Sequence, residues 1–371
     1  MDSWKTCKNI LCIRADNMGD VIMSSPAFRA VKETFNCRIT LLTSSMGNLI
    51  TPFIKDIDET IVFDLPWIKT NNEVASEQCF ALIEKLKTYH FDAAIIFTVY
   101  SQNPLPTALL AYMANIPLRL AYCRENPYAL LTNWVPDKEP YSFIQHQVER
   151  DLNLVKHIGA TTNDDKLHLH FSENDYTSCL QKLFSHSINV SDGYIILHAG
   201  VSEKKREYPT EFWIETAKLL QEKTGKTILL SGSSAEKKLT DYIQQQAGQN
   251  VFSIAGLLNI GEFIALIAHA QLVVTVNTAT VHIAVALQTP LIVLYAQTNP
   301  QHEPWKTKSV VLPFSVSQTE QSKNEVIQFV NKQRYSSFIT YPTPQQILDA
   351  AKNLNSTLIC GIPSPDKKIL V

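Results

Sequence analysis

An acidic residue, Asp20, follows a short apolar run near the amino terminus, within the stretch Met18-Gly19-Asp20-Val21. A carboxylate at the end of a strand can take the proton of an attacking hydroxyl group, which is the work of a general base. The same residue could instead serve only to cap the helix that follows, because Asp is favoured at helix starts. The residue type alone leaves both roles open.

A second junction of this kind lies near residue 277. The strand-like run Leu272–Val276 ends in Asn277-Thr278-Ala279-Thr280, and the helical run that follows carries His282 in its first turns. The unpaired backbone N–H groups of a helix start can hold a phosphate or diphosphate. We expect Asn277 or Thr278 to cap this helix and His282 to be a candidate phosphate donor, although a lone His on an apolar helix is more often structural.

Two further segments could contact a nucleotide. The cationic loop Glu203–Glu207 follows a strand, and Arg206 could pair with a diphosphate through its two-pronged guanidinium group, although a solvated run of charges is the simpler interpretation. After the next strand, Gly232 permits close approach and Glu236 could hold ribose hydroxyls. A Glu at a helix start is also favoured by the helix dipole alone.

Composition limits the class of protein. The chain has 371 residues, 45% of them hydrophobic and 18% charged, with a formal net charge of −2. This length is typical of two globular domains, and the charge argues against a nucleic-acid binder held by a basic surface. The seven cysteines are scattered without a C-x-x-C pair. Reduced thiols fit this pattern, and a zinc site has little support.

Several other classes find no motif in the sequence. No G-x-G-x-x-G follows the first strand and no G-x-x-x-x-G-K-[ST] occurs, which weakens a nicotinamide dehydrogenase and a P-loop enzyme. Asp56-Ile57-Asp58 has the spacing used by metal-dependent sugar transferases, but it lies in a predicted surface loop, so we predict no metal site and no cofactor. No run approaches the ~20 apolar residues needed to span a bilayer. We therefore expect a cytoplasmic protein, with a peripheral contact at the inner membrane as a further expectation.

The order of predicted elements gives the fold class. Strand-like and helix-like segments alternate through both halves of the chain, and the pattern restarts after Ser191-Asp192-Gly193. Such alternation predicts an α/β protein with two doubly wound parallel sheets, whose ligands bind at the carboxyl ends of the strands. We predict a first domain over residues 1–172, a second over 190–340, and a helix and tail over 341–371 that pack back on the first domain. The segment Leu167–Phe171 is predicted to be a strand.

Together these segments resemble glycosyltransferase family 9, the heptosyltransferases of the lipopolysaccharide inner core. The resemblance runs from about Ile10 to Trp305. The family's opening signature is similar to Ile10–Arg14 with Met18–Val21 and Ser25-Pro26-Ala27, and its H-x-V-E-R helix is similar to His146–Arg150. Its D-[ST]-G-x-x-H donor motif falls on residues 277–282, and its later G-P-T-D-P…W segment matches residues 296–305 in part.

The resemblance implies a GT-B fold, with two Rossmann-like domains facing a central cleft. It also implies an inverting, metal-independent transfer of heptose from ADP-heptose to a saccharide or lipid-linked acceptor, with no cofactor and no nucleic-acid partner. Asp20 would be the catalytic base. The implied donor-binding residues are Arg206, Gly232, Glu236, Asn277, Thr278, Ala279, Thr280 and His282. Acceptor recognition would fall to the first domain, where Arg14, Arg119 and Arg124 could meet anionic sugars, although for any single one an ordinary solvated surface is the simpler interpretation.

Three residues depart from the family pattern near the expected donor site. Asn277 and Asn299 each stand in place of an acid, and Ala279 stands in place of a glycine. The amide of Asn277 lacks the carboxylate's charge and can donate hydrogen bonds. Two other functions therefore stay open: a nucleotide-sugar epimerase or hydrolase with the same two lobes, and a non-catalytic protein that binds sugar nucleotides.

Overall fold

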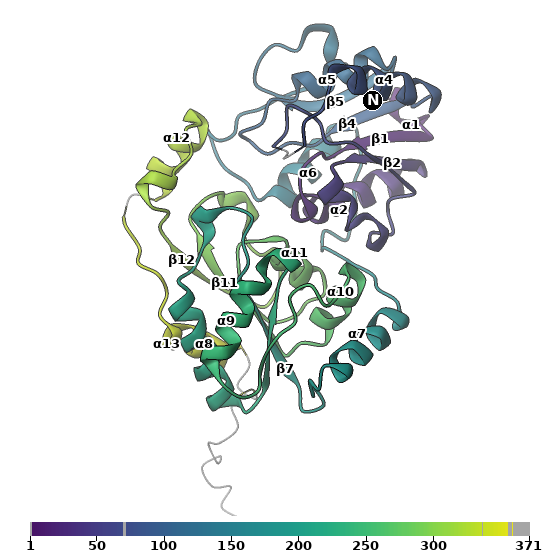
Figure 1. Cartoon of the computed structure of the whole chain (residues 1–371). Helices are drawn as coiled ribbons and strands as arrows, with labels where there is room; N and C mark the ends of the chain where they lie inside the picture. Colours follow the sequence, from purple (N-terminus) through teal and green to yellow (C-terminus); the bar gives the residue numbers. More distant parts are fainter. Residues whose placement is uncertain (1, 70–71, 336, 355–357, 359–371) are drawn as a thin grey trace, which may run out of the picture.

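The computed structural model describes residues 2–69, 72–335, 337–354 and 358, which form two α/β domains (Figure 1). The sheet of the first domain has six parallel strands. In spatial order they are β3 (Glu59–Val62), β2 (Arg38–Thr43), β1 (Asn9–Ile13), β4 (Ala93–Ile96), β5 (Leu118–Cys123) and β6 (Asn133–Pro136).

Helices cover both faces of this first sheet. Successive residues of β1 point to opposite faces, as the period of two requires, so that Ile10 packs in one core cluster and Leu11 in the other. The clusters also contain apolar residues of α2 and α6 on one face and of α4 and α5 on the other. The helices are α1 (Asp2–Lys5), α2 (Met18–Phe35), α3 (Ser45–Asn48), α4 (Ser76–Thr88), α5 (Leu105–Met113) and α6 (Gln147–Lys156), with short 3₁₀ turns η1 (Thr51–Phe53) and η2 (Tyr128–Leu130).

The second domain repeats the same strand order. Its sheet runs β12 (Ser309–Phe314), β11 (Leu291–Ala296), β10 (Leu272–Val276), β7 (Tyr194–His198), β8 (Thr227–Ser231) and β9 (Val251–Ser253). The helices are α7 (Glu173–Ser185), α8 (Thr210–Thr224), α9 (Lys237–Ala247), α10 (Ile260–His269) and α11 (Ala279–Ala286), with 3₁₀ turns η3 (Lys204–Arg206), η4 (Ser234–Glu236) and η5 (Pro300–His302). Two doubly wound parallel sheets were predicted, and this prediction is confirmed.

The two domains meet where α2 packs against α11. Gly19, in the first turn of α2, allows this approach: a Cβ atom built on it would lie 2.8 Å from Cδ2 of His282 in α11. The apolar cluster on this side is continuous, because Val21 of the first domain and Val281 of the second both belong to it. The starts of both helices therefore open into the same space between the domains.

The carboxyl-terminal helix was predicted to pack on the first domain, and this prediction is wrong. Helix α13 (Pro344–Leu354) packs against α8, with Ile347 and Leu348 buried in the core of the second domain (Figure 1). The preceding helix α12 (Glu325–Arg334), with η6 (Gln318–Glu320) before it, reaches the first domain: the Phe329 ring lies 5.0 Å from the ring of Tyr141. Residues 355–357 and 359–371 of the predicted tail lie outside the described residues.

Two smaller results complete the fold. The segment Leu167–Phe171, predicted to be a strand, belongs to no sheet; the N–H of His170 in this segment donates to the carbonyl of Phe53 at 2.9 Å. Among the helices of the described residues, none combines the length and apolar character that crossing a bilayer requires.

Candidate functional site

A cavity of about 630 Å³ lies between the two domains, at the carboxyl ends of both sheets. The start of α2 and helix α3 line it on one side, and the ends of β7, β8 and β10 with the start of α11 line it on the other. The predicted catalytic residue and all the predicted donor-binding residues line this one cavity: Asp20, Arg206, Gly232, Glu236, Asn277, Thr278, Ala279, Thr280 and His282.

Asp20 closes the start of its own helix and also lines the cavity. Its Oδ2 accepts a hydrogen bond from the backbone N–H of Asn17 at 3.2 Å and thereby closes the start of α2. Its Oδ1 lies 3.0 Å from Nη2 of Arg14, a fully buried guanidinium group. Burial is the largest single influence and disfavours the charge of Asp20, but Arg14, His302 and His282 together outweigh it and lower the pKa of the carboxyl group below its ordinary value. Asp20 is therefore ionised at neutral pH and can accept a proton.

A second carboxylate, Asp16, shares the same guanidinium group and was missed in the sequence. Its Oδ2 lies 3.2 Å from Nε of Arg14, and its Oδ1 accepts from Nε2 of Gln102 at 2.6 Å. Burial raises the pKa of Asp16 to about 6, although Arg14 opposes this shift. The sequence signal that could have identified Asp16 was its position two residues after Arg14, at the end of the first strand. The pair keeps the buried Arg14 electrically compensated.

The start of α11 offers backbone donors to the cavity. Thr278, one of the two residues predicted to cap the helix, occupies the N-cap position. Its hydroxyl makes no hydrogen bond to the helix and instead lies 3.4 Å from Oγ1 of Thr275. The first N–H groups of the helix therefore have no side-chain cap. Arg206 lies beside them, because its Nη1 donates to the backbone carbonyl of Asn277 at 3.0 Å. A helix start and a cation at one place form a site for an anion.

The charge of Arg206 is balanced inside the protein by Glu203. Nη2 of Arg206 lies 3.0 Å from Oε2 of Glu203, and the other carboxylate oxygen pairs with Lys69 of the first domain. Burial acts against this carboxylate, but Lys69, Arg206 and Lys205 lower the pKa of Glu203 to about 2. The predicted cationic loop is thus an ion-paired structure that also joins the two domains, and Nε of Arg206 is buried without a hydrogen-bond partner.

Asn277 does not cap α11, contrary to one of the two expectations. Its Oδ1 accepts from the N–H of Ala296 at 3.2 Å, and its Nδ2 donates to the carbonyl of Ala296 at 3.2 Å and to Oγ1 of Thr298 at 3.1 Å. A carboxylate could not donate to this carbonyl. The amide at this position is therefore explained by the bond it makes between the ends of β10 and β11.

Glu236 lies between two glycines at the ends of β7 and β8. One of its carboxylate oxygens accepts from the N–H of Ser233 at 2.6 Å. A Cβ atom built on Gly232 would lie 3.0 Å from a carboxylate oxygen, and one on Gly200 would overlap the other at 1.9 Å. A side chain at Gly200 would therefore displace the carboxylate of Glu236 from its present position, and one at Gly232 would crowd it. Gly200 carried no signal in the sequence, because it follows the strand as an isolated residue.

Two histidines from the second domain face Asp20. His282 is 5% exposed, and burial together with His302 lowers its pKa to about 3. Nε2 of His302 lies 3.7 Å from Oδ1 of Asp20, and the two imidazole rings meet edge to face at 6.2 Å. Both rings are therefore neutral at neutral pH. His302 was missed because it lies in η5, in a segment that resembled the family only in part.

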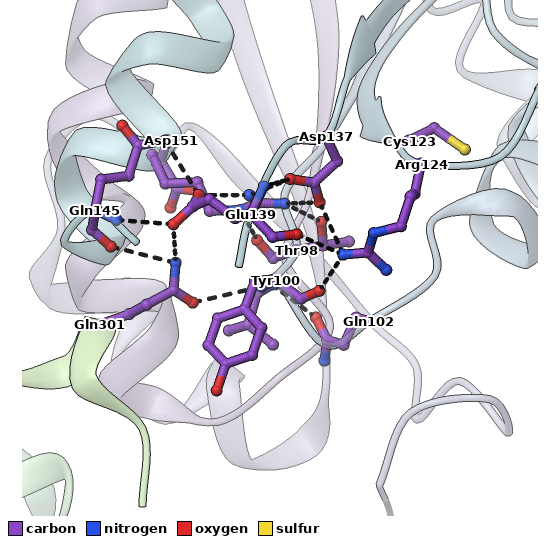
Figure 2. Close-up of polar contacts among 12 residues, drawn as sticks. Thr98, Tyr100, Gln102, Cys123, Arg124, Asp137, Glu139, Gln145, Asp151 and Gln301 are labelled. Atoms are coloured by element: carbon purple, nitrogen blue, oxygen red, sulfur yellow. Dashed lines mark hydrogen bonds and ion pairs between the residues drawn. The ribbon is translucent and has the colours of Figure 1, made fainter. Parts of the chain in front are cut away.

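The three arginines predicted to bind the acceptor do not line the cavity. Arg14 is buried beneath Asp20, and Arg119 donates to backbone carbonyls that include those of Leu130 at 2.7 Å and Ala129 at 2.8 Å. Arg124 donates to the carbonyls of Tyr100 at 2.9 Å and Glu139 at 2.7 Å (Figure 2). Their charges hold loops of the first domain in place.

A loop of the second domain is anchored in the first. Gln301 is fully buried, and its Nε2 donates to Oε1 of Glu139 at 3.1 Å in a network of polar side chains from the first domain (Figure 2). Arg150 compensates this carboxylate, with its Nη1 2.7 Å from Oε2 of Glu139 and its Nη2 2.8 Å from Oδ2 of Asp137. Nε1 of Trp305 also donates to the carbonyl of Asp165 at 2.8 Å. We call residues 297–306 the docking loop.

Comparisons with known proteins support the two-domain fold and indicate a family. The model of a family described as glycosyltransferase family 9 (heptosyltransferase) matches residues 79–333. Lipooligosaccharide heptosyltransferase 2 of Haemophilus influenzae is 24% identical over 80% of this chain and 85% of its own length. Among solved structures, a family 9 glycosyl transferase of Veillonella parvula has a TM-score of 0.74 at 16% identity, covering 94% of this chain and 97% of its own. The Escherichia coli ADP-heptose lps heptosyltransferase II has a TM-score of 0.69 at 20% identity, covering 93% and 98%.

Proposed function

Because the chain belongs to glycosyltransferase family 9, we propose that it transfers heptose from ADP-heptose to a saccharide of the lipopolysaccharide core or a related surface glycan. Two observations of relatives support the finer points: one is named a lipooligosaccharide heptosyltransferase, and another is described with ADP-heptose. The observation that carries the proposal is that Asp20 and the Arg206–α11 site line one cavity from opposite domains.

The proposed reaction is a single displacement at the anomeric carbon. The acceptor hydroxyl attacks this carbon on the face opposite to the diphosphate, and Asp20 takes the hydroxyl proton as the new C–O bond forms. The bond from the anomeric carbon to the diphosphate oxygen breaks, and its electron pair leaves with ADP. One displacement of this kind inverts the anomeric configuration.

The second domain would bind the donor and stabilise its departure. Arg206 and the first N–H groups of α11 would hold the diphosphate as its negative charge grows, and such fixed donors commonly provide the largest share of catalysis. The carboxylate of Glu236, held at the ends of β7 and β8, would accept bonds from ribose hydroxyls. Because these groups belong to the chain, the proposed mechanism is metal-independent. A lipid-linked acceptor would bring the protein to the inner membrane surface.

The test is a transfer assay on Asp20→Asn. The purified protein is given ADP-heptose and a heptose-free core oligosaccharide, ADP release is followed, and the product's anomeric configuration is read by NMR. We expect kcat to fall by about 10²–10⁴-fold, the range for loss of a general base, while the Kd for ADP-heptose, measured by calorimetry, stays close to that of the wild type.

The same assay separates the competing functions. Equal turnover with and without the acceptor would contradict transfer and indicate an epimerase or hydrolase, which the product spectrum would identify. Donor binding without turnover on any core acceptor would indicate a non-catalytic binding protein. Full activity of Asp20→Asn would contradict the role of Asp20 while leaving transfer itself intact.

A further inference from the structure

The docking loop brings a histidine of the second domain to the proposed base of the first. Gln301, buried in the polar network of the first domain, fixes the loop beside the cavity (Figure 2). The neighbouring residue, His302, then lies with Nε2 3.7 Å from Oδ1 of Asp20. An imidazole at this place can donate to the carboxylate only if its Nε2 carries a hydrogen.

The orientation of Asn299 decides which nitrogen of His302 carries the hydrogen. Oδ1 of Asn299 lies 3.0 Å from the backbone nitrogen of Gln301, and a backbone N–H can only donate. The amide oxygen must therefore face Gln301, so that Nδ2 faces Nε2 of His302 at 3.1 Å. Because Nδ2 is a donor, Nε2 must be an acceptor, and the hydrogen of the neutral ring is on Nδ1.

This arrangement leaves Asp20 without a hydrogen bond from His302. Its described hydrogen bonds come from Arg14 to Oδ1 and from the N–H of Asn17 to Oδ2. Each carboxylate oxygen has a further lone pair, which an acceptor hydroxyl could use. An imidazolium in place of the neutral ring would instead donate to Oδ1 and make Asp20 a weaker base.

The charged and titratable groups around His302 come from several elements. Asp20 favours its protonation, while Arg14, Arg206 and His146 oppose it, and His282 packs edge to face against the ring. Burial is the largest effect, and together these groups lower the pKa of His302 to about 4. The neutral state that the hydrogen bonds require is thus also the state that the surroundings favour.

We propose that Asn299 is a positioning residue that holds His302 in its neutral Nδ1–H tautomer beside Asp20, so that the base keeps a free lone pair for the acceptor hydroxyl. The inference rests on the proposed function of Asp20. Asn299 acts through His302 and does not line the cavity itself. An Asp at this position would accept a hydrogen from Nε2 and would favour the imidazolium.

NMR of histidine labelled with ¹⁵N tests the tautomer without any need for activity. The His302 signals are assigned by their loss in His302→Gln. In the wild type at pH 7 we expect a neutral ring with hydrogen on Nδ1, and in Asn299→Asp a hydrogen on Nε2 with a pKa raised by about one unit or more, the size expected of a close carboxylate. A wild-type ring with its hydrogen on Nε2, or an Asn299→Asp ring identical to the wild type, would overturn the proposal.

Kinetics then test the consequence for the base. In Asn299→Asp we expect the loss of kcat on the acid side to begin about one pH unit higher than in the wild type, following the raised pKa of His302, while kcat at pH 7 changes little. In the wild type the same loss should occur only as the pH falls through about 4, the pKa of its His302.

Two variants control this kinetic test. Asn324→Asp adds the same charge at the N-cap of α12, where an acid is equally suitable, and should leave the pH profile unchanged. Asn299→Asp/His302→Gln should lose the new pH dependence, because no imidazolium can form. A new pH dependence that persists in the double variant would contradict the role of His302, whereas a tautomer change with no transfer in any variant would contradict the proposed function alone.

Discussion

The two domains have the same strand order but use the carboxyl ends of their sheets differently. In the first domain the charges at this edge are paired with one another, as in the Arg14 pairs with Asp16 and Asp20 and the Arg150 pairs with Asp137 and Glu139. In the second, Arg206 pairs with Glu203, but the first N–H groups of α11 have no side-chain cap. One edge uses its charges internally around the proposed base, and the other keeps helix-start donors that an anionic ligand could use.

The largest expected change in stability tests the compensated edge. Arg150→Met should lower the free energy of unfolding by about 3–5 kcal/mol, because it leaves the buried Glu139 without its cation and Asp137 with only the more distant Arg124 at 3.8 Å. Urea denaturation at pH 7 measures this loss. Arg38→Met, which removes an exposed arginine paired with Glu59, is the matched control and should leave the midpoint nearly unchanged. Equal midpoints for both variants would show that the network does not hold the first domain together.

The next prediction tests the edge of the second domain. Arg206→Ala should weaken kcat by about 10²-fold, the usual loss for one fixed donor to a developing charge, with little loss of folding stability. The control is Lys205→Ala in the same loop, since Lys205 pairs with Glu203 without lining the cavity. Transfer kinetics and thermal unfolding of both variants provide the measurement. If Lys205→Ala were as impaired as Arg206→Ala, the loop would act by its overall charge rather than through one guanidinium group.

The smallest expected effect concerns the departure from the family pattern at position 277. Asn277→Asp restores an acid but leaves the carbonyl of Ala296 without its donor, and should lower the free energy of unfolding by about 1–3 kcal/mol. Donor affinity should also fall, since the new charge lies beside the proposed diphosphate site. Thermal unfolding and calorimetry with ADP-heptose measure both, with Asn324→Asp as the charge control. A more stable variant would refute the structural explanation of this amide.

The sequence predicted those features that depend on local pattern. Alternating apolar runs predicted both sheets, and the strand-to-helix junctions at Asp20 and at Thr278 marked the two sides of the cavity, because a helix start follows a strand end directly along the chain. The resemblance to the family strengthened Arg206, for which a solvated run of charges was the simpler interpretation, and Glu236, which the helix dipole alone could explain.

Other features depend on tertiary contacts and could not be read in this way. An arginine that binds an acceptor cannot be told by residue type from one that holds a loop. Only the fold shows that carboxylates or backbone carbonyls of the first domain already pair with Arg14, Arg119 and Arg124. His302 reaches Asp20 because the neighbouring Gln301 anchors the docking loop to Glu139. These two partners lie 162 positions apart in the sequence. The apolar face of α13 showed that the helix would be buried, but not against which domain.

Gly19 has a consequence for how far the molecule can shut. With hydrogen as its side chain, the first turn of α2 rests directly on the ring of His282. A single methyl group there would force the first turn of α2 and the ring of His282 apart. Bond formation depends steeply on such separations, so under the proposed function one missing carbon atom would help Asp20 to reach a sugar bound by the other domain.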